Sequence, residues 1–284
     1  MSDLKEITIY HSPDADDAFM FYGFESGAVD IPGFKFEHAL NDIESLNQLA
    51  IKKELEVTAV SIHAYAYIND AYALLPCGAS MGGEDYGPRL VCNSERSLTD
   101  GSIKTIATPG ELTSALLAMM IYMQENNIEA EIVNMDFDQI QHAVKDGTVD
   151  AGVVIHEGQI TTEKDGLVVI LDLGKWWWQE TGLPLPLGIN VIRKDMGNES
   201  ILAVRKALQI SIEYGLANRK EAIDYAMQFG RGLSHQEADT FIEMYVNDLT
   251  CDIGDKGKES IKLFLDKAFK YGLIPSEVNP EFID

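Results

Sequence analysis

The sequence has few cationic residues for its acidic content. Its 284 residues include 22 Lys and Arg against 46 Asp and Glu, which gives a formal net charge of -24 at pH 7. A chain with this balance cannot neutralise successive phosphates along a nucleic acid, and anionic membrane surfaces repel it. Nucleic acid and membrane are therefore excluded as partners. The composition does not exclude a small anionic ligand, provided that backbone amides at a helix N-terminus bind it against the repulsion of the negatively charged protein.

Cysteines and long apolar runs are also scarce. The three cysteines, Cys77, Cys92 and Cys251, are widely spaced and show no metal-ligand pattern, as in proteins of a reducing cytosol. No stretch approaches the ~18 consecutive apolar residues that a transmembrane helix needs. The first residues, MSDLKEITIY, carry neither the basic nor the apolar region of a signal peptide. We therefore expect a cytoplasmic protein without signal peptide, membrane span or bound metal.

Standard catalytic signatures are missing, but strands and helices alternate regularly. The sequence contains no P-loop, no G-x-G-x-x-G after a strand, no G-x-S-x-G and no H-E-x-x-H. Over the first two thirds, apolar runs such as EITIY, VTAVSI and DAGVVIH alternate with helical segments, and after residue 198 the pattern is helical alone. The chain is therefore predicted to be an α/β protein with C-terminal helices. Its two α/β blocks and crossover resemble the clamp of the periplasmic binding proteins.

The stretch IYHSPDADDAFMFYG, residues 9–23, places a polar cluster between an apolar strand and an apolar helix. Open α/β sheets bind ligands at the carboxyl ends of strands, and Ser12, Asp14, Asp16 and Asp17 fall at such an end. Aspartates at a helix start also cap the helix and complement its dipole, but three carboxylates exceed what capping needs. A functional role is therefore expected for Asp16 or Asp17.

The segment IATPGELTSALLAMM, residues 106–120, has two candidate helix starts. Thr108, followed by Pro109 and Glu111, is a good local capping signal. A start at Thr113 and Ser114 would instead point two hydroxyls and their amides at an anion. The local pattern slightly favours Thr108.

Two later stretches carry further signals. In DAGVVIHEGQ, an apolar strand ends at His156 and Glu157. A lone histidine more often has a structural role. This one falls where such sheets bind ligands, and imidazole can act as a base near neutral pH. The tryptophans 176–178 fit a core, a subunit contact or an aromatic wall for a flat ligand. Pro184 and Pro186 argue against a regular central strand and for a rigid crossing between domains.

Together these motifs resemble one enzyme family. SPDADDAFMFYG, DIESLN, VSIHAYAYI, GPRLV, AGVVIHEG and LGKWWWQETGLPLPLG fall in the order found in the 1,4-dihydroxy-6-naphthoate synthases of the futalosine route to menaquinone. The resemblance implies a two-lobed type II periplasmic-binding-protein-like fold, one lobe comprising residues 1–106 and 192–284 and the other 107–191. It also implies a lyase that converts cyclic dehypoxanthinyl futalosine to 1,4-dihydroxy-6-naphthoate with release of dihydroxyacetone, without metal or organic cofactor.

The resemblance also assigns site residues. His156 matches the family's catalytic histidine and is expected to be the general base, and Asp17 matches the acidic residue near the reacting ring. Because residues 113–115 match an anion-binding helix start, the helix is expected to begin near Thr113 rather than at Thr108. The residues expected to bind the small anionic substrate are Ser12, Asp16, Asn41, Ala59, Val60, Ser61, Thr113, Ser114 and Ala115. The sequence does not exclude a homodimer.

The aspartate cluster departs from the family pattern, which commonly reads Ser-Pro-Cys-Pro-Asn-Asp-Thr-Phe. Here an amide becomes a carboxylate at Asp16, and a hydroxyl is lost at Ala18. We expect Asp14 to be a solvated turn, Asp16 to shape the pocket and Asp17 to face the reacting ring, with burial raising the pKa of the more enclosed carboxyl. The alternatives are chorismate dehydratase of the same pathway and a non-catalytic solute-binding protein, and the Ile-His-Glu triplet favours the synthase over both.

Overall fold

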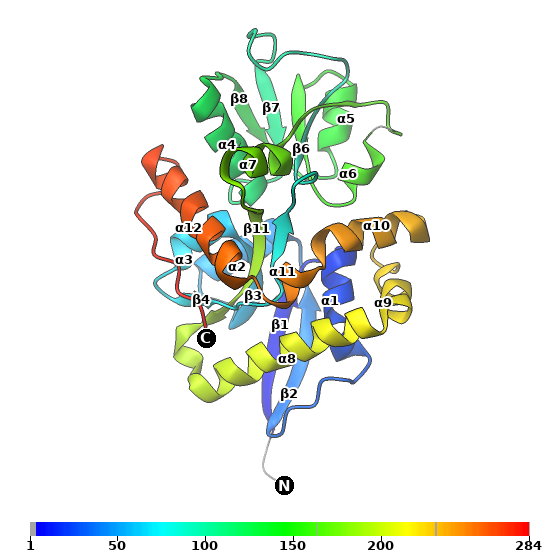
Figure 1. The fold of residues 1–284 in the computed structure, drawn as a ribbon, viewed down its shortest axis with the longest axis vertical. Coiled ribbons are helices and arrows are strands. Elements are labelled where there is room, and N and C mark those ends of the chain that lie inside the picture. The colour runs from blue at the N-terminus through cyan, green and yellow to red at the C-terminus, as the bar shows by residue number, and fades with distance from the viewer. Residues whose placement is uncertain (1–3, 163, 231, 284) are drawn as a thin grey trace.

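The first of two β-sheets is built mainly from the N-terminal part of the chain. The computed structural model describes residues 4–162, 164–230 and 232–283 (Figure 1). The first sheet has the strand order β2-β1-β3-β11-β4, and β5 also pairs with β11. Its strands are β1 (Lys5–His11), β2 (Phe34–Leu40), β3 (Val57–Ser61), β4 (Tyr72–Leu74), β5 (Ser80–Gly82) and β11 (Leu185–Arg193). β1 runs parallel to β2 and β3, whereas β11 is antiparallel to its neighbours.

The second sheet forms the core of the other lobe and has the order β10-β6-β9-β7-β8. Its strands are β6 (Arg89–Cys92), β7 (Thr105–Thr108), β8 (Glu131–Asn134), β9 (Ala151–Val154) and β10 (Val168–Asp172). β7 runs parallel to β8 and β9, and β6 is antiparallel to β9 and β10. Segments that follow β1, β7 and β9, together with the end of β3, reach one cavity between the lobes.

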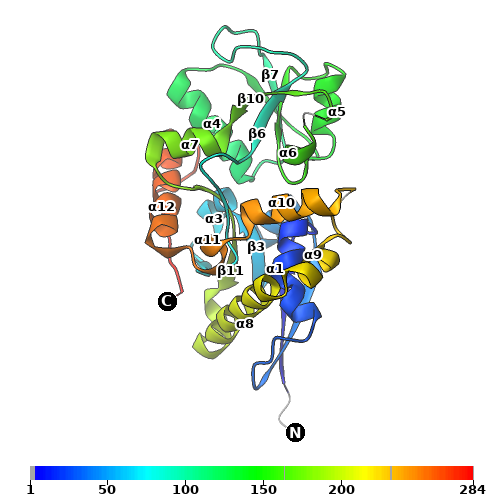
Figure 2. The ribbon, with the colours of Figure 1, turned by 45° about the vertical axis from the view of Figure 1, so that its right-hand side comes forward.

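Helices surround both sheets. Those on the first lobe are α1 (Ala15–Glu25), α2 (Ile43–Ile51), α3 (Ile62–Ile68), α8 (Asn198–Ala217), α9 (Arg219–Ala226), α10 (His235–Tyr245), α11 (Asp248–Cys251) and α12 (Gly254–Lys270), with a 3-10 turn η1 (Lys194–Met196). Those on the second lobe are α4 (Ser114–Asn126), α5 (Ile140–Lys145), α6 (Gly158–Thr161) and α7 (Leu173–Thr181). In Figure 2, α10 lies between the second lobe and α1. Within the described part of the chain, each helix is too short or too polar to cross a membrane.

The crossings between the lobes fall earlier than the predicted boundaries at residues 106 and 191. β6 belongs to the second sheet, so the chain leaves the first lobe between β5 and β6, and it has rejoined the first sheet in β11. The predicted boundaries differ because a strand pattern in the sequence does not reveal which sheet the strand joins. The first crossing packs against the start of α7 at Gly87 and Gly174, and a Cβ on Gly174 would lie 2.0 Å from the carbonyl oxygen of Tyr86. The close backbone approach therefore requires glycine.

The expectation that Pro184 and Pro186 argue against a regular central strand holds only in part, because Pro184 precedes β11 but Pro186 lies within it. This strand contains Pro186 and lies between β3 and β4 in the first sheet. Around Pro186 the strand pairs with β5, with a register shift before Gly188, and its pairing with β3 begins at Gly188. The proline therefore lies outside the regular central ladder, where its missing N–H is tolerated.

The tryptophan run forms part of the core rather than a wall of the cavity. Trp176 and Trp177 are buried on α7. The indole nitrogen of Trp177 donates to Oγ of Ser260 at 3.1 Å, and this hydroxyl donates to the carbonyl oxygen of Pro184 at 2.6 Å. The chain returning to the first lobe is thereby fixed to α12.

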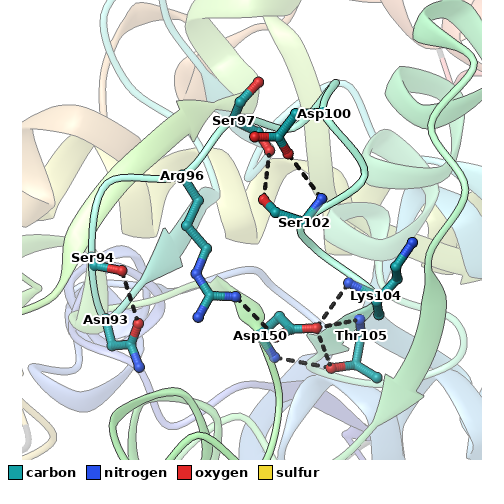
Figure 3. A network of polar contacts seen from close by, with 9 residues as sticks. All are labelled: Asn93, Ser94, Arg96, Ser97, Asp100, Ser102, Lys104, Thr105 and Asp150. Carbon is teal, nitrogen blue, oxygen red and sulfur yellow. Dashed lines mark hydrogen bonds and ion pairs between the residues drawn. The ribbon is translucent and has the colours of Figure 1, made fainter.

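The carboxylate of Asp150 contacts both ends of the long connection between β6 and β7 (Figure 3). Its Oδ2 accepts hydrogen bonds from the backbone N–H groups of Lys104 at 2.8 Å and Thr105 at 3.1 Å, and its Oδ1 lies 2.9 Å from Arg96. These contacts, the Lys104 amide foremost, lower the pKa of Asp150. Among the residues described, none of those in Figure 3 lines the cavity.

Candidate active site

A cavity lies between the lobes and is lined by residues of both. The cavity brings together most of the residues expected to form the site: Ser12, Asp16, Asp17, Ala59, Ser61, Thr113, Ser114, Ala115 and His156. These residues come from separate segments of both lobes, so the fold rather than sequence proximity assembles them.

Asn41 and Val60 are the two expected residues that do not line this cavity in the described structure. Side chains alternate across a strand, so Ala59 and Ser61 of β3 face the cavity while the fully buried Val60 faces the opposite side, in the core. Asn41 follows β2, where its backbone N–H donates to the carbonyl oxygen of His11 and its side chain accepts the N–H of Asp42. Asn41 therefore shapes the turn before α2.

Asp14 is not the solvated turn that the sequence predicted, because it is only 3% exposed. It occupies the N-cap position of α1, but among the described residues its carboxylate makes no cap hydrogen bond to that helix. Instead, the hydroxyl of Ser12 donates to Oδ2 of Asp14. The same Oδ2 lies 3.0 Å from Nδ1 of His156 in the other lobe. The apparent capping residue is thus a partner of the candidate base.

His156 follows β9 and adopts an uncommon backbone conformation with φ of +54°. Left-handed conformations of non-glycine residues cost energy and often occur at functional sites. The side chain is 18% exposed and packs edge-on against Phe137, with ring centroids 5.1 Å apart. Asp14 on one side and Phe137 on another therefore hold the imidazole at the cavity wall.

Several further contacts join the lobes around the cavity. The carboxylate of Glu157 accepts the backbone N–H of Ala15 at 3.4 Å, at the positive end of α1. The hydroxyl of Tyr245 on α10 donates to Oε1 of Gln159 at 2.8 Å, and Glu44 accepts the N–H of Leu112 at 3.1 Å. The described structure is therefore a closed arrangement of the two lobes.

The cavity carries acidic groups whose pKa values are raised. Burial, and next the nearby Asp14, raise the pKa of Asp16 to about 7. Burial, followed by Asp16, also raises the pKa of Asp17 well above its ordinary value. Asp17 accepts the backbone N–H of Ser12 at 2.9 Å, and Asp16 accepts the hydroxyl of Ser80 at 3.4 Å. Asp16 can therefore take up a proton near neutral pH, and burial favours the protonated form of Asp17 in the same direction, as the sequence predicted for the enclosed member of the cluster.

The start of α4 faces the acidic loop from the other lobe. Thr113 is its N-cap and accepts the N–H of Leu116 at 3.2 Å, so the start expected from the family resemblance is correct and the local signal at Thr108 is not used. The hydroxyl of Ser114 donates to the carbonyl oxygen of Leu187 at 2.5 Å, which ties this helix start to β11. None of the described residues that line the cavity is lysine or arginine. An anion in the cavity therefore depends on hydroxyls and the helix amides.

Comparison with known proteins assigns the chain to a family. A family model described as menaquinone biosynthesis matches residues 7–270. The protein belongs to the menaquinone biosynthesis family. The 1,4-dihydroxy-6-naphtoate synthase of Thermus thermophilus is 33% identical over 99% of this chain and 100% of its own length. The crystal structure of AF1704 from Archaeoglobus fulgidus, 45% identical, has a TM-score of 0.89 and covers 95% of this chain and 98% of its own.

More distant structures share the fold alone. The alkanesulfonate-binding protein SsuA of Xanthomonas axonopodis pv. citri is 10% identical, with a TM-score of 0.75 and coverage of 98% of this chain and 97% of that one. The prediction of a two-lobed binding-protein-like fold with C-terminal helices is thereby confirmed. In this member of the menaquinone biosynthesis family, the terminal helices also reach the cavity, since α10 contributes Phe241 and Tyr245 to its lining.

Sequence reasoning missed several residues that build the site. Asn47 on α2 is fully buried, and its side chain accepts the N–H of Ser61 at 2.9 Å and donates to the hydroxyl of Ser61 at 3.1 Å. Tyr245 lies in a segment that reads as an ordinary helix, so no local signal marks it, whereas Gln159 ends the DAGVVIHEGQ stretch that was singled out for His156. Asn47 falls within the DIESLN motif, and that motif is the signal that points to it.

Proposed function

We propose that this protein is a carbon–carbon lyase, a 1,4-dihydroxy-6-naphthoate synthase. It converts cyclic dehypoxanthinyl futalosine to 1,4-dihydroxy-6-naphthoate and releases dihydroxyacetone, in the cytoplasm. The observation that carries the proposal is the position of His156, which lines the cavity together with the acidic loop and the start of α4. Identity to a named synthase over the full length of both chains supports this reaction.

Within this proposal the two lobes hold opposite ends of the substrate. The amides and hydroxyls of Thr113, Ser114 and Ala115 bind the aromatic carboxylate, because a helix N-terminus provides unpaired N–H groups and a positive dipole end. His156 removes a proton as general base. Asp17 faces the reacting ring, and Asp16 shapes the pocket beside it. A protonated carboxyl among these can donate a hydrogen bond to a developing oxyanion.

Closure of the lobes has two consequences for such a reaction. It removes bulk water from the cavity, which strengthens every electrostatic interaction there and protects reactive intermediates. It also brings His156, from the second lobe, against a substrate whose reacting part lies on the first. The net charge of -24 does not prevent anion binding, because the amides at the start of α4 act at short range inside the cavity.

The test is direct incubation of the purified protein with cyclic dehypoxanthinyl futalosine, with chorismate as a parallel substrate. We expect 1,4-dihydroxy-6-naphthoate and dihydroxyacetone in equal amounts from the first and no change in the second. Dehydration of chorismate would assign the protein to the sister enzyme. Tight binding of the cyclic substrate without turnover would identify a solute-binding protein.

A further inference from the structure

Asp14 and His156 form a pair that spans the cleft. Oδ2 of Asp14 lies 3.0 Å from Nδ1 of His156, and the two side chains are only 4% and 18% exposed. Asp14 sits at the start of α1 in the first lobe, and His156 follows β9 in the second. The hydroxyl of Ser12 donates to the same carboxylate oxygen. The carboxylate is therefore fixed on its own lobe before it meets the imidazole.

This contact selects one form of the imidazole ring. An ionised carboxylate only accepts hydrogen bonds, so Nδ1 of His156 must carry the hydrogen that joins the pair. Nε2 then keeps its lone pair and is the nitrogen that can accept a proton. A carboxylate in this position also stabilises the imidazolium that forms after proton transfer, as in serine-protease triads.

We propose that Asp14 is a positioning residue for His156, and that the pair is assembled when the lobes close. The inference rests on the proposed function, in which His156 is the general base. In the reaction a proton passes from the substrate to Nε2 of His156, the bonding electrons stay on the substrate, and Asp14 balances the imidazolium charge. Because the two residues belong to different lobes, an open cleft separates the base from its partner. Proton abstraction is thereby confined to the closed state.

A second contact between the lobes lies next to the pair of Asp14 and His156. Glu157, next to His156, accepts the N–H of Ala15, next to Asp14, at 3.4 Å. Two consecutive residues of one lobe thus dock on two consecutive residues of the other, at the N-terminus of α1. The carboxyl groups that interact electrostatically with this region are Asp16, Asp17 and Glu157 besides Asp14 itself.

The first test replaces Asp14 by asparagine. In Asp14→Asn the amide nitrogen can donate to Nδ1, which moves the ring hydrogen to Nε2 and blocks the base. We expect kcat to fall at least ~100-fold, the scale of a misplaced general base, while the Kd for cyclic dehypoxanthinyl futalosine stays within about threefold. Asp150→Asn, which removes a paired carboxylate in the network of Figure 3, is the control and should leave kcat unchanged.

A kcat for Asp14→Asn within about threefold of wild type would overturn the proposal. The second readout needs no turnover: nitrogen-15 NMR of histidine-labelled protein at neutral pH, with the His156 signals assigned by their loss in His156→Asn. Wild type should show hydrogen on Nδ1 of His156 and Asp14→Asn on Nε2, whereas hydrogen on Nε2 in both would overturn the proposal. If wild type converts no cyclic substrate, the proposed function fails, and the spectrum still decides the role of Asp14.

Discussion

The hydroxyl of Tyr245 donates to Oε1 of Gln159 at 2.8 Å, and this hydrogen bond joins α10 of the first lobe to α6 of the second. Both side chains are buried and line the cavity, and burial raises the pKa of Tyr245, so its hydroxyl stays protonated. The C-terminal helices therefore take part directly in holding the lobes together.

Tyr245→Phe should weaken closure. The substitution leaves the buried Oε1 of Gln159 without its donor, which costs about 1–3 kcal/mol in the closed state only. We expect weaker binding of cyclic dehypoxanthinyl futalosine, by about fivefold or more in Kd measured by calorimetry. Tyr65→Phe is the control, because its hydroxyl accepts the N–H of Glu281 within the first lobe. Equal effects of the two variants would contradict a role of Tyr245 in closure.

The backbone of His156 gives a prediction about stability. At φ of +54° a side chain is strained by about 1 kcal/mol relative to glycine. His156→Gly should therefore be more stable to urea than His156→Ala by about that amount, although both lack the imidazole. The order should reverse at Lys206, an exposed residue within α8, where glycine costs about 1 kcal/mol relative to alanine. If the alanine variant is the more stable one at both positions, the backbone of His156 is not strained.

Asp16 should make stability depend on pH. Its pKa is raised from 3.8 to about 7 in the folded protein, chiefly by burial, so folding favours the protonated form. The stabilising contribution is fully present below pH 3.8 and is lost as the pH rises to about 7. Asp16→Asn removes this titration, so its Tm relative to wild type should increase between pH 5 and pH 8. A constant difference in Tm across that range would mean that Asp16 is ionised throughout.

Much of the fold could be predicted because it depends on local patterns. Apolar strands alternating with amphipathic helices indicate two α/β lobes, and His156 was marked by its place at a strand end. Sheet membership could not be predicted, since β6 resembles a strand of either lobe and only its hydrogen-bond partners in β9 and β10 decide. Pro186 was misjudged for the same reason, because the register shift beside it is a property of the sheet.

The site shows where local rules fail. By those rules, Asp14 before a helix is a capping residue and Thr108 before Pro109 is a helix start. In the folded protein, the partner of Asp14 lies in the other lobe, and Gly110 adopts φ of +141°, which carries the chain on to a cap at Thr113. Contacts between segments distant in sequence decide both positions, and a capping signal contains no information about them.

The anion site at α4 can be tested with two variants at one position. Ser114→Ala removes the hydroxyl, whereas Ser114→Pro also removes the N–H, and Thr113 before it has the extended conformation (φ -72°, ψ 145°) that proline requires. If the amide holds the carboxylate, Ser114→Pro should bind 1,4-dihydroxy-6-naphthoate about tenfold more weakly than Ser114→Ala, as expected for a hydrogen bond to a charged group. Equal affinities would argue against the amide.

A crystal grown with a small aromatic carboxylic acid gives an independent view of that site. We expect the carboxylate at the amides of residues 113–115. Carboxylate density beside Arg89 or Lys175, with those amides unoccupied, would contradict the assignment. Arg89 is a poor competitor, because it already pairs with Asp172 and donates to the carbonyl oxygen of Gln159 at 2.8 Å.

The central claim is that His156 is the general base of this lyase, and His156→Asn tests it most directly. Asparagine tolerates the left-handed backbone at this position, so the fold and the cavity should be preserved. With cyclic dehypoxanthinyl futalosine at saturation, we predict a kcat at least ~100-fold below wild type and a Kd within about threefold. A kcat within a few-fold of wild type would contradict the account.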